Sequence, residues 1–216
     1  MTFTVPLALR ALALPLRLPR PARGVIALAA PAFVLLSFIP VPWWGLFVWP
    51  LVAFASVRAV DSISLEGKLV LSRPVTMRTA AVASLGLFSG ILMGALALIG
   101  SWAMQVPHDP FPEPASSIVG HSFRETFSMT LTAFAAASMA RGEERPWVAC
   151  LDACKAFLSN PLSILAVCAV QAVLVAPVAG AWAFYSKTWL LPALLGLSPV
   201  FMLILSMASL PRQGKQ

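Results

Sequence analysis

The chain has 216 residues, of which 59% are hydrophobic and only 11% are charged. Soluble domains carry about 25% charged residues, so this composition excludes an ordinary soluble domain and predicts a membrane protein. The net charge of +7 is therefore not a sign of nucleic-acid binding, because basic residues gather on the cytoplasmic loops of membrane proteins.

Residues 1–23 alternate leucine with arginine and contain no acidic residue. This pattern predicts a basic amphipathic segment at an anionic membrane surface, with a disordered basic tail as the alternative. We expect Pro15 to interrupt any helix there. Arginines recur throughout the segment, whereas a cleavable signal peptide has one basic end, so we expect no such signal.

Residues 24–210 are expected to form a single transmembrane domain, followed by a short cytoplasmic tail at 211–216. A span needs roughly 20 apolar residues, and the apolar stretches accommodate about six. Pro40 and Pro42 divide the first stretch into two short spans, for which a re-entrant hairpin is the alternative. The expected spans are 22–39, 43–60, 79–104, 123–140, 161–185 and 189–210.

The basic residues test this topology. If the N-terminus, the C-terminus and the connectors after the second and fourth spans share one side, that side holds 13 of the 15 Lys and Arg residues. Only Arg124 and Lys187 lie on the opposite side. This bias predicts that both termini lie in the cytoplasm.

An internal repeat accompanies the topology. "VAFASVRA" at 52–59 returns as "TAFAAASM" at 132–139, and "LSRP" at 71–74 returns as "LSNP" at 158–161. Proline suits the first turn of a helix, so each such motif predicts the start of a span. The predicted fold is all-α: a polytopic bundle of three helical hairpins joined by amphipathic cytoplasmic connectors.

The segment "ARGEERPWVACLDACKAFLSNP" at 140–161 resembles bacterial inner-membrane families of the YciC-like kind. In those families a small-residue helix ends in an Arg-Gly-Glu turn, and a surface helix then leads into the next span. The resemblance implies an integral inner-membrane protein to which no reaction is assigned. In this chain, Trp147, Leu151, Cys154 and Leu158 are expected to share one face of the surface helix.

Gly86, Gly90 and Gly94 recur every four residues in the third span. Glycines at this spacing let another backbone approach closely. The favoured interpretation is packing within the chain, against the small residues of the fourth span. The alternative is an interface with a protein partner or a second copy.

Four polar residues are weak candidates for a site: His108, Asp109, His121 and Gln171. The first three lie in or beside a proline-rich loop, and their spacing matches no metal motif, so a solvated loop is favoured. Gln171 lies near the middle of a span and is expected to hydrogen-bond another helix. Almost no ionisable group lies within a span, which argues against ion-coupled transport.

Cys150 and Cys154 lie one helical turn apart, without the C-x-x-C spacing of a redox pair. No nucleophile–base arrangement or phosphate-binding glycine loop occurs, so no catalysis, metal or cofactor is expected. The predicted function is that of a scaffold or accessory subunit in the lipid bilayer, with a protein partner or a second copy. The alternative is a small permease or lipid-handling protein, and substrate and partner stay open.

Overall fold

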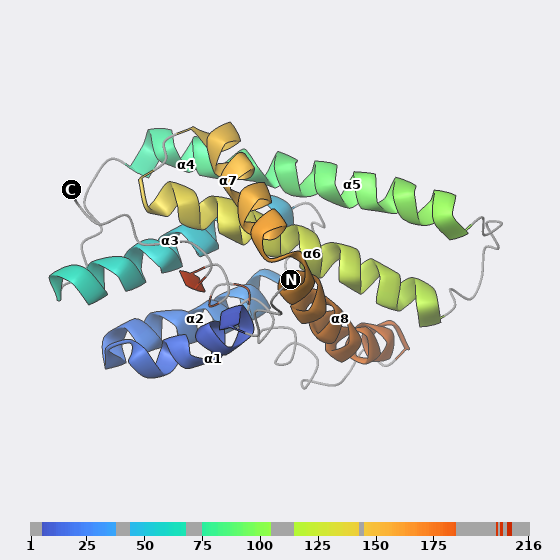
Figure 1. Cartoon of the computed structure of the whole chain (residues 1–216), viewed down its shortest axis with the longest axis horizontal. Coiled ribbons are helices and arrows are strands. Elements are labelled where there is room, and N and C mark those ends of the chain that lie inside the picture. The colour runs from blue at the N-terminus through green and yellow to red at the C-terminus, as the bar shows by residue number, and fades with distance from the viewer. Residues whose placement is uncertain are drawn as a thin grey trace.

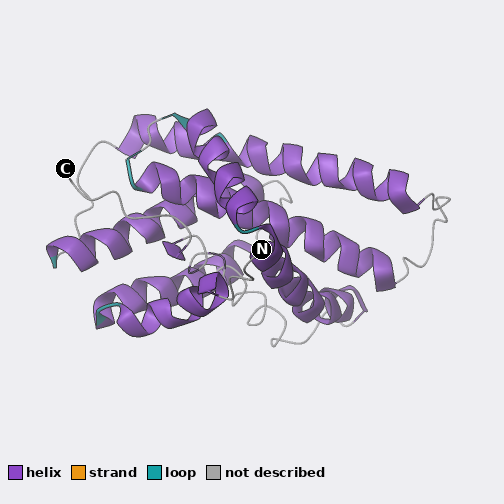
Figure 2. Ribbon diagram, viewed as in Figure 1, coloured by secondary structure: helices purple, strands orange, loops and turns teal. Residues whose placement is uncertain are grey.

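The computed structural model of the chain describes residues 6–37, 44–67, 75–104, 115–142 and 145–184, together with Met202, Ile204, Met207 and Ala208. Within these residues every regular element is a helix, and no strand occurs (Figure 2). The all-α prediction is thus confirmed for this part of the chain. The helices are α1 Pro6–Arg17, α2 Arg20–Ser37, α3 Trp44–Glu66, α4 Val75–Ala83, α5 Leu85–Met104, α6 Ala115–Ala140, α7 Pro146–Ser159 and α8 Pro161–Phe184.

Prolines begin three of these helices, since Pro6 is the first residue of α1, Pro146 the first of α7 and Pro161 the first of α8. Two expectations about helix ends were wrong. Helix α1 continues through Pro15 to Arg17, because a proline in the last turn removes one hydrogen bond just before the helix ends anyway. Helix α3 continues beyond residue 60 to Glu66.

Helix α3 ends where glycine permits a backbone conformation that other residues avoid. Gly67 has φ +66°, and its N–H donates to the carbonyl of Ile63 at 3.2 Å. This arrangement is a common glycine-based helix end. The polar residues from Asp61 to Glu66 therefore extend the helix and do not form a connector.

Two helical stretches in the described residues are long and apolar enough to cross a membrane, Phe47–Glu66 and Thr79–Leu96. The second stretch covers α4 and α5, which only Ser84 separates. A third span results if α7 and the first part of α8 count as one bent element, with a bend of 93°. The apolar segment Thr126–Ala140 of α6 is shorter than a span.

Helix α6 lies at the centre of the fold. It contacts α3, α5, α7 and α8, and Figure 1 shows α3 and α5 alongside it with α7 crossing over it. Every residue from 126 to 137 is buried. Alanines and hydroxyl residues dominate this stretch, and such small side chains let neighbouring helices approach closely.

The buried hydroxyls of α6 are satisfied locally. Thr130 donates to the carbonyl of Thr126 at 2.7 Å, and Thr132 donates to that of Ser128 at 2.8 Å. Ser128 donates to the carbonyl of Ser89 on α5 at 2.8 Å, and the two serine hydroxyls are 2.7 Å apart. These bonds remove the cost of burying polar groups and join α5 to α6.

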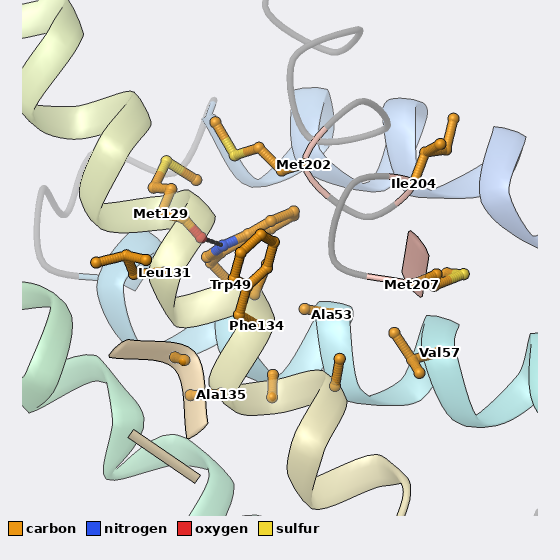
Figure 3. Packing of buried hydrophobic residues seen from close by; sticks show 14 of the residues in the cluster. Trp49, Ala53, Val57, Met129, Leu131, Phe134, Ala135, Met202, Ile204 and Met207 are labelled. Atoms are coloured by element: carbon orange, nitrogen blue, oxygen red, sulfur yellow. Dashed lines mark hydrogen bonds between the residues drawn. The ribbon is translucent and has the colours of Figure 1, made fainter. Parts of the chain in front are cut away.

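Helices α3 and α6 run parallel and in register. The indole N–H of Trp49 donates to the carbonyl of Met129 at 2.9 Å, across 80 residues of sequence (Figure 3). Asp61 and Arg141, twelve residues further along each helix, also pair across 80 residues. The offset between the segments 52–59 and 132–139 is the same 80 residues. The two similar segments thus lie side by side.

Candidate functional site: a charged cavity at the end of the bundle

The C-terminal ends of α3 and α6 are joined by an ion pair. Nε of Arg141 donates to Oδ2 of Asp61 at 2.9 Å, and the two side chains are 7% and 15% exposed. A second guanidinium nitrogen donates to the carbonyl of Met207 at 3.4 Å. Arg141 therefore ties α3, α6 and the C-terminal part of the chain together.

The corner between α1 and α2 lies over this ion pair. Arg23 of α2 donates from Nε to the carbonyl of Leu18 at 2.9 Å and from a terminal nitrogen to that of Leu16 at 3.2 Å. Cationic side chains commonly satisfy the last carbonyls of a helix in this way. Arg23 thereby sets the angle at which α2 leaves α1.

A cavity of about 320 Å³ separates the corner from the helix ends. The corner, the end of α3 and the ion pair form its walls. Its lining consists of Leu14, Arg17, Leu18, Pro19, Val60, Asp61, Ser64, Arg141 and Met207. It is thus apolar on one part of its wall and charged on another, and this size is at the lower end of ligand pockets.

Two polar groups on the wall are unused within the described residues. Oγ of Ser64 is buried and has no hydrogen-bond partner there. Arg17 is exposed and forms no ion pair with any described residue. Since buried polar groups are nearly always hydrogen-bonded, the Ser64 hydroxyl is a donor available to a ligand.

Helix α7 presents the predicted apolar face to the outside. Trp147, Leu151 and Leu158 are 61%, 49% and 72% exposed, and Cys154 on the same face is partly exposed. Ala149 and Ala153 are buried on the opposite face. Ser138 of α6 donates to Oδ2 of Asp152 at 2.9 Å and fixes α7 across α6. The outward face of α7 suits the boundary between water and lipid.

Partial burial makes Cys150, one of the two cysteines of α7, unreactive. It raises the pKa of the Cys150 thiol to about 11, and the neighbouring Cys154 contributes a smaller rise. Only the thiolate is a nucleophile or a metal ligand, so Cys150 stays protonated and inert at neutral pH. Among the described residues, no group of three His, Cys, Asp or Glu side chains is placed to hold a metal ion.

The glycine row of α5 passes from the inside of the fold to the outside. Gly86 is buried, Gly90 is half-buried and Gly94 is exposed. A Cβ added at Gly90 or Gly94 would meet no heavy atom within 4 Å. Residues four apart turn about 40° around a helix of 3.6 residues per turn, so the row cannot follow one contact face. Among the described residues nothing packs against these two glycines, and an external interface stays a prediction.

The side chains of the four predicted polar candidates are outside what the structure describes. His108 and Asp109 lie outside the described residues, and His121 and Gln171 lie in α6 and α8 with side chains that are not described. The cavity was missed by sequence reasoning, although one signal pointed to it. Asp61 and Arg141 each follow one of the two similar segments, 52–59 and 132–139, by two residues, with opposite charges at the matching position.

Comparisons with protein-family models, with curated proteins and with solved structures find no match to this chain. The resemblance to families of the YciC-like kind therefore stays a prediction.

Proposed function

We propose that this chain is a bacterial inner-membrane protein that serves as a non-catalytic scaffold or accessory subunit of a membrane complex. In this proposal six spans form three hairpins, and both termini lie in the cytoplasm. The helix positions support this arrangement, because α2, α3, α5, α6 and α8 each coincide with an expected span. The parallel course of α3 and α6 also agrees, since the second and fourth spans would both run inward.

The observation that carries the proposal is the open face of α5. Within the described residues Gly90 and Gly94 have free space beside them, and the neighbouring Leu87 and Ile91 are 60% and 70% exposed. A helix that exposes glycine offers a notch where the backbone of a second helix packs closely. We infer that a partner subunit or a second copy packs there.

The test compares two adjacent positions of α5. The full chain is purified in mild detergent, and its assembly mass is measured for Gly94→Leu and for Ala95→Leu. Ala95 is also exposed and lies about 100° further round the helix. We expect Gly94→Leu to release the assembly and Ala95→Leu to retain it. Because Gly94 has free space, the leucine fits without disturbing the fold, and an unchanged melting temperature verifies this.

The proposal fails if the wild-type chain has the mass of a monomer, or if the Gly94→Leu variant assembles normally.

The cavity favours a second candidate function, that of a small permease or lipid-handling protein. A permease needs a polar path past α6, so water-soluble thiol reagents would reach Cys168, which is fully buried beside Thr130. In a variant with Cys150 and Cys154 replaced by serine, the scaffold proposal expects labelling of Cys168 only after denaturation. Rapid labelling of the native protein would favour the permease.

A further inference from the structure

We propose that the cavity at the ends of α3 and α6 binds the phosphate group of an anionic membrane phospholipid. This binding goes beyond the proposed subunit role. It rests on the proposed membrane location, but it does not depend on the open face of α5.

The charges on the cavity wall favour an anion. Arg17 and Arg141 contribute two positive charges and Asp61 one negative charge, which leaves a balance of +1. The carboxylate of Asp61 is engaged by Arg141 at 2.9 Å, whereas Arg17 forms no ion pair with a described residue. Arg17 is therefore the cation available to an incoming anion, and arginine matches phosphate oxygens with two parallel N–H donors.

Ser64 supplies a second donor on the same wall. Its Oγ is buried and has no partner among the described residues, and it lines the cavity together with Arg17. Leaving a buried hydroxyl without a partner is unfavourable. A phosphate oxygen inside the cavity would accept its hydrogen. Two donors of different kinds thus converge on one space.

The rest of the wall is apolar, and this favours a lipid over free phosphate. Leu14, Leu18, Val60 and Met207 complete the lining. Inorganic phosphate would gain nothing from these side chains, whereas the glycerol and first acyl carbons of a phospholipid would be removed from water against them. Pockets of about 300 Å³ or more hold small organic ligands, so a phosphoglycerol group fits.

The cavity also lies near one end of the apolar stretch of α3. Asp61 and Ser64 belong to the last two turns of the stretch Phe47–Glu66. The cavity is therefore on the side of the span that faces the lipid head groups.

The test measures lipid binding by native mass spectrometry of the full chain in neutral detergent. The probes are short-chain phosphatidylglycerol, phosphatidylcholine of the same chain length, and inorganic phosphate. Three variants are compared with the wild type: Arg17→Gln, Ser64→Ala and Arg20→Gln. Arg20 is an exposed arginine of the same corner that does not line the cavity, so it controls for general surface charge.

We expect phosphatidylglycerol to bind at least about tenfold more tightly than phosphatidylcholine, and Arg17→Gln to abolish most of that difference. Ser64→Ala should weaken phosphatidylglycerol binding several-fold, and Arg20→Gln should leave it unchanged. Since Arg17 is exposed, its replacement should not alter the melting temperature. If the melting temperature does change, phosphatidylglycerol binding by Ser64→Ala, compared with the wild type, decides the outcome.

The proposal is overturned if phosphatidylcholine binds as tightly as phosphatidylglycerol, or if Arg17→Gln and Arg20→Gln have equal effects. It is also overturned if inorganic phosphate displaces the lipid at the lipid's own concentration, because free phosphate would then be the ligand. The Gly94→Leu variant separates the two proposals. If this variant loses assembly and still binds lipid, both the interface on α5 and the lipid site are supported. If it also loses lipid binding, the lipid site is not independent of the face of α5.

Discussion

Arg141, the residue that follows α6, holds Asp61 of α3 at 2.9 Å, and the two residues occupy matching positions after the two similar segments of the chain. The pair is nearly buried, with side chains 7% and 15% exposed. Because α3 and α6 run parallel, residues with the same offset meet at the same level. The opposite charges at this position thus join the two helices at the end where the cavity lies.

Removing one partner of this pair should destabilise the protein. Asp61→Asn leaves the buried charge of Arg141 without its partner, and Arg141→Leu does the same to Asp61. Either loss typically costs about 3 kcal/mol. Thermal unfolding in detergent measures the loss, and the charge-swapped double variant Asp61→Arg with Arg141→Asp should recover part of it. The exposed pair of Asp152 and Lys155, at 3.8 Å, is the control, since Lys155→Gln should cost less than about 0.5 kcal/mol. Equal effects of Arg141→Leu and Lys155→Gln would contradict this assignment.

The buried indole of Trp49 should matter more than an exposed one. Trp49 is 1% exposed and donates to the carbonyl of Met129. Trp49→Phe removes this bond and some packing volume, so we expect a loss of about 1–3 kcal/mol in the free energy of unfolding. Trp147 is 61% exposed and lies under the guanidinium of Arg145. Trp147→Phe should have little effect on unfolding, and a larger effect at Trp147 than at Trp49 would refute the packing described for α3 and α6.

Local signals predicted much of this fold. Helix starts at Pro146 and Pro161 follow from the chemistry of proline, and apolar stretches place most helices because periodicity acts within one segment. The end of α3 was misplaced because Asp61 looked like the start of a polar connector, whereas the helix stops only at Gly67. Gly67 was the local signal for the helix end, but the prediction followed the change in hydropathy at Asp61.

Long-range relationships were not predictable in the same way. The hydrogen bond from Trp49 to Met129 and the ion pair of Asp61 with Arg141 depend on which helices become neighbours. No local pattern determines that. Both pairs do share the offset of 80 residues that separates the similar segments 52–59 and 132–139. The glycine row was interpreted as one packing face, but its spacing of four residues carries Gly94 away from the face that holds Gly86.

The thiol of Cys150 should react slowly and only at high pH. Its pKa is raised to about 11 by burial, and the thiolate is the reactive form, so raising the pH increases the reactive fraction. In a variant that retains Cys150 and has serine at positions 154 and 168, alkylation by a maleimide should accelerate about tenfold per pH unit up to about pH 10. A rate that levels off near pH 8 would indicate an ordinary exposed thiol.

The exposed face of α7 should lie against lipid head groups. Leu151 and Leu158 are 49% and 72% exposed, so Leu151→Glu with Leu158→Glu should weaken the attachment of this face without opening the core. The expected result in membranes is a large increase in water accessibility of a nitroxide label at Trp147. A label at the exposed Lys155 serves as the water-accessible reference. If the label at Trp147 is already as accessible as that at Lys155 in the unaltered helix, α7 does not contact lipid.

The central claim is that another protein chain packs on the open face of α5, and photo-crosslinking in native membranes tests it most directly. A photoreactive amino acid is placed at Leu87, beside the glycines, or at Ile99, which is exposed about 120° further round the helix. We predict a protein adduct of discrete mass from Leu87 that Gly94→Leu abolishes, and only lipid adducts from Ile99. Lipid adducts alone from Leu87 would contradict the account.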